Sequence, residues 1–272
     1  KMKKKKVKKR KKRNKKKEKK RKEKEKKKEK IKKEEEGIRE TQKTGEKGEG
    51  NKRKQMKKAK GKINDKWNRV GLPTDKGVAA PVISVAIAPN STAPAVRIHS
   101  NASYGHLLQK GPWPAGVISW QWRLDAALSK ANLKEKAGDD AALKVCVSFD
   151  HKDGSVPWGE RLLLRIARST SALDLPAATI CYIWDNRYPI GTTGANPYTK
   201  RVRYMVLQTN TSALNEWTTQ RRNLSDDFIK LFGDEAQVVP PVSAIAVGAD
   251  TDNTQEQALG WVNNLRWETP AK

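Results

Sequence analysis

The sequence predicts an all-β fold: an antiparallel, jelly-roll-like β-sandwich with one or two short helices, preceded by a lysine-rich tail. Short runs of alternating apolar and polar residues recur from Trp67 onward, and Gly, Pro, Asn and Asp separate them. All nine Trp lie in this part of the chain, so a substantial core is available. Helical patterns are few and do not alternate with the strands, which argues against a parallel α/β sheet.

The lysine-rich tail differs from the rest of the chain in charge and in apolar content. Residues 1–62 contain 35 Lys and Arg and 10 Asp and Glu, a balance of +25, which leaves +3 of the total +28 for residues 63–272. Their scattered apolar residues cannot offset a chain entropy of about 1–2 kcal/mol per ordered residue. We therefore expect a disordered chain or an isolated helix in the tail, and one sandwich domain over residues 63–272.

Three interpretations of the tail remain open. A polybasic arm would bind nucleic acid or an anionic surface through counterion release, although it has no aromatic residue for base stacking. The tail could also be a passive extension. Lys, Glu, Arg and Gly can all be encoded by purine-only codons, so the tract could instead be a translated purine-rich stretch of DNA.

The sequence also bears on membrane insertion and redox state. There is no run of 18 apolar residues and no apolar segment typical of a secretory signal, so we expect neither a transmembrane helix nor a signal peptide in this sequence. Cys146 and Cys181 are too few for a disulfide framework and lack metal-ligand spacing. They could form one disulfide, but we favour two buried thiols, because a lone Cys behaves as a small hydrophobe.

Alternation predicts the strands and the faces that they bury. The predicted strands are 82–88, 95–99, 117–124, 143–150, 178–184, 201–208, 242–248 and 261–267. In the third and fourth of these, every second side chain is apolar and is predicted to face the core. These core residues are Ile118, Trp120, Trp122, Leu124, Leu143, Val145, Val147 and Phe149.

Two segments have the pattern of a helix. The predicted helix over residues 225–231 begins at Ser225, a good N-cap. Asp226 and Asp227 suit its positive N-terminal end, and Gly233 can close it. In residues 160–172 the apolar residues recur at the spacing of one helical face. These residues are Leu162, Leu163, Ile166 and Ala167.

Five blocks of the chain resemble, in order, a known bacterial family. They read SWQWRLDAALSKANLKEKAGDDAALKVCVSFD, PAATICYIWDNRYPIGTT, PYTKRVRYMVLQ, WTTQRRNLSDDFIKLFG and VPPVSAIAVGADTDNT. The family is the domain of unknown function 3047, and the resemblance covers about residues 64–267. It implies a secreted or periplasmic protein of Gram-negative bacteria with no assigned activity. The C-terminal end is also similar to galactose-binding-like jelly rolls, a likeness of fold that carries no function by itself.

An acidic loop is the first candidate site. Asp250, Asp252, Asn253 and Thr254 offer oxygen ligands at nearly alternate positions, as a hard cation such as calcium needs. The loop lacks the Gly and the later Glu of an EF-hand. The alternative is that these side chains close turns on their own backbone.

Three aspartates near a predicted strand are the candidate catalytic residues. Asp139 and Asp140 precede the strand, Asp150 ends it, and paired carboxylates can act as acid and base in sugar hydrolysis. Adjacent residues on extended backbone point apart, so Asp139 and Asp140 are not expected to share a substrate. One of them could instead lie near Asp250 and Asp252 across the sheet. A solvated turn without function is the alternative.

Accessible aromatic and basic side chains are the candidate ligand-binding residues. Trp158 lies in the turn-like DGSVPWGE and Trp184 directly precedes Asp185, so we expect accessible rings that stack on a carbohydrate, with Asp185 as a further candidate ligand-binding residue. Arg201 and Arg203 share one face of a strand and could bind an anionic ligand through paired hydrogen bonds. The alternative is a set of ion pairs that joins this basic cluster, including Lys200, Arg221 and Arg222, to Asp185, Asp226 or Asp227.

These features favour a non-catalytic sandwich of the bacterial envelope that binds a carbohydrate-like ligand. The alternatives are a hydrolase acting on envelope glycans through the aspartates, and binding of nucleic acid or an anionic surface by the tail. His99, His106 and His151 lack zinc spacing, and the chain has no G-x-S-x-G or Gly-rich phosphate loop. We expect no cofactor apart from the possible calcium, and nothing here indicates an oligomeric state.

Overall fold

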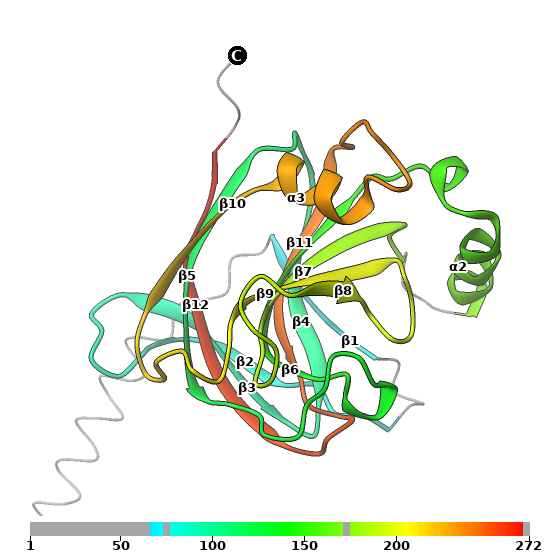
Figure 1. Cartoon of the computed structure of the whole chain (residues 1–272). Coiled ribbons are helices and arrows are strands. Elements are labelled where there is room, and N and C mark those ends of the chain that lie inside the picture. The colour runs from blue at the N-terminus through cyan, green and yellow to red at the C-terminus, as the bar shows by residue number, and fades with distance from the viewer. Residues whose placement is uncertain (1–65, 73–76, 171–174, 269–272) are drawn as a thin grey trace, which may run out of the picture. The chain divides into compact units, whose positions relative to one another are not determined.

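The computed structural model describes residues 66–72, 77–170 and 175–268, which form a β-sandwich (Figure 1). The predictions for the lysine-rich tail concern residues outside this described part. Among the helices of the described part, none is long and apolar enough to cross a membrane.

The sandwich consists of a seven-stranded and a five-stranded sheet. The first has the order β1-β4-β11-β6-β7-β9-β8, with bounds Trp67–Gly71, Tyr104–Trp113, Val242–Asp250, Ala141–Phe149, Ala178–Trp184, Val202–Gln208 and Thr193–Ala195. The second has the order β10-β5-β12-β3-β2, with bounds Thr218–Asn223, Val117–Ala126, Gln257–Glu268, Pro94–Asn101 and Val82–Ile87. The paired strands are antiparallel except β7 and β9, which are parallel, so the predicted antiparallel arrangement fails for that one pair.

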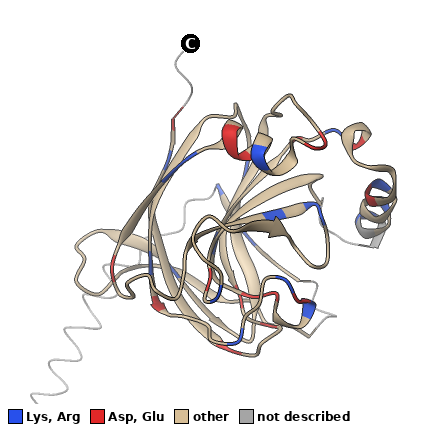
Figure 2. Ribbon diagram, in the orientation of Figure 1, with Lys and Arg blue, Asp and Glu red and all other residues tan. Residues whose placement is uncertain are grey.

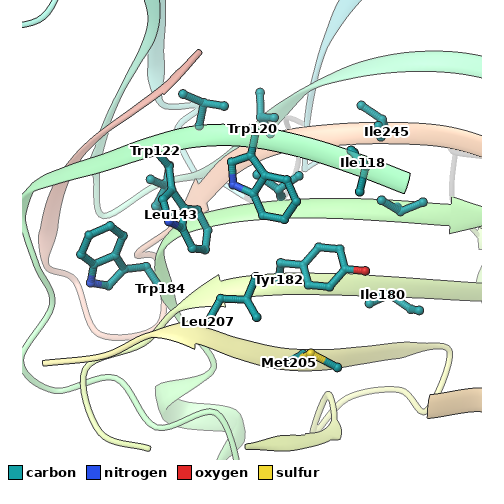
Figure 3. Close-up of a cluster of buried hydrophobic side chains, with 14 of the residues drawn as sticks. Ile118, Trp120, Trp122, Leu143, Ile180, Tyr182, Trp184, Met205, Leu207 and Ile245 are labelled. Atoms are coloured by element: carbon teal, nitrogen blue, oxygen red, sulfur yellow. The ribbon is translucent and has the colours of Figure 1, made fainter. Parts of the chain in front are cut away.

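Aromatic side chains fill the core between the two sheets (Figure 3). Trp120 on β5 lies 5.3 Å from Tyr182 on β7, and Trp122 lies 5.6 Å from Trp184, measured between ring centroids. Burying an apolar side chain of this size contributes about 1.5–3 kcal/mol. The predicted core faces are confirmed, since all eight of their residues are buried. The expectation that Trp184 is accessible is wrong, because only 1% of its surface is exposed.

All the predicted strands are present, but four further strands were not predicted: β1, β4, β8 and β10. Three of these, β1, β8 and β10, are edge strands. An edge strand packs on one side only and tolerates polar residues, so its alternation is weak. β4 contains Gly105, Gly111 and Pro112, residue types that indicate turns in a sequence.

Helix α3 (Leu224–Phe232) is found where it was predicted, with a different N-cap. The side chain of Asn223 accepts a hydrogen bond from the Ser225 N–H (3.0 Å), so the expected N-cap at Ser225 is wrong by two residues. Phe228 and Phe232 bury the inner face of α3 in the main core.

Helix α2 (Trp158–Thr170) is also found, but the face that it buries is not the predicted one. Leu164 packs with Val156 and Ala177, while Leu162 and Leu163 are exposed. Two short 3-10 helices, Lys136–Gly138 and Asp153–Ser155, complete the described helices.

The two cysteines form a disulfide, so the prediction of two buried thiols is wrong. Cys146 on β6 and Cys181 on β7 lie directly opposite each other in the antiparallel pair, with Cα atoms 4.1 Å apart. Alternation assigns each Cys to a face of its strand, but it does not specify the register between two strands. The pairing therefore could not be read from either strand alone.

Candidate functional site

Four aspartates from two segments gather at one end of the seven-stranded sheet, and we call Asp139, Asp140, Asp250 and Asp252 the aspartate cluster. The antiparallel neighbours β6 and β11 pair Ala141, the first residue of β6, with Asp250, the last residue of β11. Asp140, Asp250 and Asp252 consequently each place a carboxylate oxygen within 4.8 Å of the others. The structure thus brings these residues together across the sheet, as one sequence interpretation proposed.

Asp140 is buried, and its carboxylate holds the loop that follows β11. Oδ1 accepts hydrogen bonds from the backbone and side-chain N–H groups of Asn253 (3.2 and 3.3 Å). Oδ2 accepts from the N–H (2.7 Å) and the hydroxyl (2.5 Å) of Thr254. These four donors occupy both oxygens, which leaves Asp140 no free acceptor for a substrate. The adjacent Asp139 has a different partner, the side-chain amide of Asn196.

A buried lysine lies within the cluster. The Lys144 ammonium is 2.9 Å from Asp250 Oδ2 and 4.7 Å from the ring centroid of Tyr104. Although burial favours the neutral amine, Asp250 raises the pKa of Lys144. Burial raises the pKa of Asp139 and of Asp250, and the neighbouring carboxylates raise both further. The cluster therefore has a negative potential that Lys144 only partly offsets, and it favours groups that bring positive charge or hydrogen-bond donors.

Three carboxylates of the aspartate cluster have the spacing that a hard cation could bridge, but two features of the cluster compete with cation binding. Asp140 is saturated by the loop, and Lys144 already supplies a positive charge to Asp250. Asp250 Oδ1 is buried without a hydrogen-bond partner in the described part of the chain. Asn253 uses its amide to hold the loop. Calcium at Asp250, Asp252 and Asn253 therefore stays a prediction, and turn formation through Asp140 is what the contacts display.

An exposed tyrosine stands beside the cluster. Tyr198 has 58% of its surface exposed, and its hydroxyl donates to Lys136 O (2.9 Å), with Asn253 Oδ1 as a second, more distant acceptor (3.4 Å). Its backbone N–H donates to Asn196 Oδ1 (2.9 Å), the residue that also holds Asp139. Sequence reasoning missed Tyr198, because it lies in the irregular segment NPYTKR between β8 and β9. An aromatic residue in such an Asn- and Pro-containing loop is the signal that could have found it.

Other predicted site residues are not members of the cluster, although Trp184 and Asp185 line a small pocket together with Asp140. Asp150 follows the end of β6, a nine-residue strand, and is therefore roughly 30 Å from Asp140, too far for the two carboxylates to act on one bond. Trp158 is exposed, as expected, but it lies on α2. Asp185 is buried, and it accepts hydrogen bonds from the N–H groups of Arg187 (2.9 Å) and Tyr188, which makes it a turn residue.

Arg201 and Arg203 are engaged in ion pairs, so neither offers a free guanidinium to an anionic ligand. Arg201 is buried and makes two hydrogen bonds of 2.6 Å to Glu235. Arg203 pairs with Asp234 (2.7 Å) and with Glu235. The ion-pair interpretation therefore describes the structure better, but its partners were wrong. Of the pairs expected for the basic cluster, the described residues form Arg222 with Asp227.

His106 on β4 provides a test of the burial around the cluster. Burial lowers its pKa to about 4 from 6.5, and Lys144 adds to this effect. The unfolded chain binds more protons between these values, so His106 stabilises the fold above pH 6.5 and this stability is lost as the pH falls toward 4. We expect His106→Gln to reduce the loss of unfolding free energy between pH 7 and 4.5 by roughly 2 kcal/mol. Urea titrations at both pH values check this; equal losses in both proteins would contradict it.

The sequence comparison decides the family. Residues 65–266 match the family described as "Protein of unknown function (DUF3047)", which is more than half of the chain. The chain belongs to the DUF3047 family. Among curated proteins none matches it significantly.

Several solved structures resemble this DUF3047 protein at low identity. The xyloglucanase domain of NopAA, a type three effector from Sinorhizobium fredii in complex with cellobiose, has 11% identity and a TM-score of 0.39 over 77% of this chain and 97% of that one. The catalytic domain of Humicola grisea Cel12A has 12% identity and a TM-score of 0.39, over 76% of this chain and 94% of that one. Trichoderma harzianum endoglucanase 3 from family GH12 has 8% identity and a TM-score of 0.39, over 76% of this chain and 92% of that one. At these scores the likeness is no argument for a shared activity.

Proposed function

We propose that this DUF3047 protein is a non-catalytic binding protein whose ligand is a carbohydrate-like, polyhydroxylated molecule. The observation that supports it is the exposed ring of Tyr198 beside the aspartate cluster. An aromatic ring offers an apolar face for stacking, and carboxylates accept hydrogen bonds from hydroxyl groups. Asp252, which is half-buried, and the side chains around Tyr198 supply such groups at the surface.

A non-catalytic role is favoured over hydrolysis by the state of the carboxylates. The best acid–base pair would be Asp250 and Asp252, because their oxygens are within 4.8 Å and burial raises the pKa of Asp250. However, Asp250 is only 8% exposed and is bound to Lys144, so it is poorly placed to reach a glycosidic oxygen. Release of reducing sugar from a bound glycan, lost in Asp250→Asn, would establish the hydrolase instead.

A glycan array probed with the full chain tests the proposal, with and without calcium. The buffer contains enough salt to screen the lysine-rich tail, since the Debye length falls to about 3 Å at 1 M. We expect Tyr198→Ala to weaken binding of any selected glycan by about tenfold, because about 1.4 kcal/mol of stacking is removed. Trp158→Ala, which removes an exposed ring far from the cluster in sequence, is the matched control. Equal binding by both variants would contradict this site.

The disulfide is evidence about the redox state of the compartment in which this protein works. Disulfides form and persist in oxidising compartments such as the periplasm and the extracellular space. We therefore infer a periplasmic or secreted location, which the family resemblance also implies. Alkylation of free thiols in intact cells, followed by mass spectrometry, should leave Cys146 and Cys181 unmodified; labelling of both would argue for a reducing compartment.

A further inference from the structure

Helix α2 turns its apolar side away from the protein body. Trp158 is 77% exposed and Leu163 61%, and Leu162 and Ile166 are exposed as well. Positions 158, 162 and 166 follow one another at intervals of four, so they form one stripe along the helix, with 163 beside it. The buried contact is made by Leu164, about half a turn away. In Figure 1 the helix stands at the right edge of the view, to the right of β7 and β8.

Cationic side chains accompany this apolar stripe. From Lys152 to Thr170 the segment has four Lys and Arg and two Asp and Glu, a net charge of +2 (Figure 2). Arg165 is exposed and lies three positions after Leu162, at the border of the stripe. Arg161 is held locally by Val156 O (3.0 Å), and Arg168 is held by Asp153 (2.8 Å), so both charges stay close to the helix.

We propose that the exposed face of α2 binds the surface of an anionic phospholipid membrane. An interfacial helix needs a large apolar face with Trp or Leu, a basic border and a low overall hydrophobicity, and α2 has all three. Trp158 at one end suits the boundary between headgroups and acyl chains. The charge favours this partner, because the exposed cationic Arg165 beside the apolar stripe complements an anionic lipid surface.

The test must separate α2 from the tail, whose charge of +25 would by itself attract the full chain to anionic vesicles. We therefore place an environment-sensitive fluorophore on α2 through Leu163→Cys in the full chain, since both native Cys are in the disulfide. The matched control carries the same probe at Val238→Cys, an exposed apolar site outside α2. The vesicles contain phosphatidylcholine with about 30% phosphatidylglycerol or with none.

We expect a blue shift of the probe at position 163, and none at 238, when vesicles with phosphatidylglycerol are added. Arg165→Glu should lower the vesicle partition coefficient reported by this shift by about tenfold, because the charge at the lipid surface is reversed. Vesicle binding without a shift at 163 would assign binding to the tail and overturn the proposal. A shift that follows protein concentration without lipid would assign the face to a second copy, with the same consequence.

Discussion

Replacing Glu235 with Gln should lower the free energy of unfolding by about 3–5 kcal/mol, the largest effect that we expect from one substitution. The Glu235 side chain is almost fully buried and binds Arg201 through both oxygens, and it also binds Arg203. His151 Nε2 lies 3.7 Å from it. Loss of the carboxylate charge leaves two guanidinium groups without their main counter-charge in a poorly hydrated region. Urea denaturation at pH 7 measures the change.

Asp234 is the control for this substitution. It also binds Arg203, but its side chain is 65% exposed. An exposed ion pair contributes about 0–1 kcal/mol, so Asp234→Asn should have little effect. If Glu235→Gln were as mild as Asp234→Asn, the buried network would not be a main source of stability.

Removing the disulfide should have the second largest effect. The bond closes a loop with a sequence separation of 35 residues, which restricts the unfolded chain by about 3–4 kcal/mol. We expect Cys146→Ala with Cys181→Ala to lower the unfolding free energy by that amount, with the fold retained because both positions are small and buried. Calorimetry or urea denaturation checks this. Wild-type protein measured in reductant should match the double variant, and a change below about 1 kcal/mol would show that the bond contributes little.

The fold was readable from the sequence where a strand alternates apolar and polar residues without interruption. There both the core face and the opposite face are constrained, so alternation is strong, as in the run that places Trp120 and Trp122 in the core. The edge strand β10, with the sequence TTQRRN, lacks this constraint and was missed. The internal strand β4 was missed because Gly and Pro interrupt its alternation, whereas the edge strand β2 was predicted. The parallel pairing of β7 and β9 depends on contacts between distant segments, which no local pattern encodes.

The candidate site was readable only in part. The meeting of Asp140 with Asp250 and Asp252 could be suggested, because each borders a predicted strand. The role of Asp140 in holding Asn253 and Thr254 could not, since it depends on atomic geometry. The exposure of the apolar face of α2 could not be predicted for another reason. Periodicity shows which residues share a face, and it does not show whether that face meets the protein or something outside it.

Hydrogen–deuterium exchange of the full chain, with and without the glycan that the array selects, tests the central claim most directly. A ligand held by Tyr198 and the aspartate cluster should slow exchange of the backbone amides in residues 196–199 and 251–256. Exchange in α2 should not change. Protection confined to other segments, with these two loops unaffected, would contradict the account and place the ligand elsewhere.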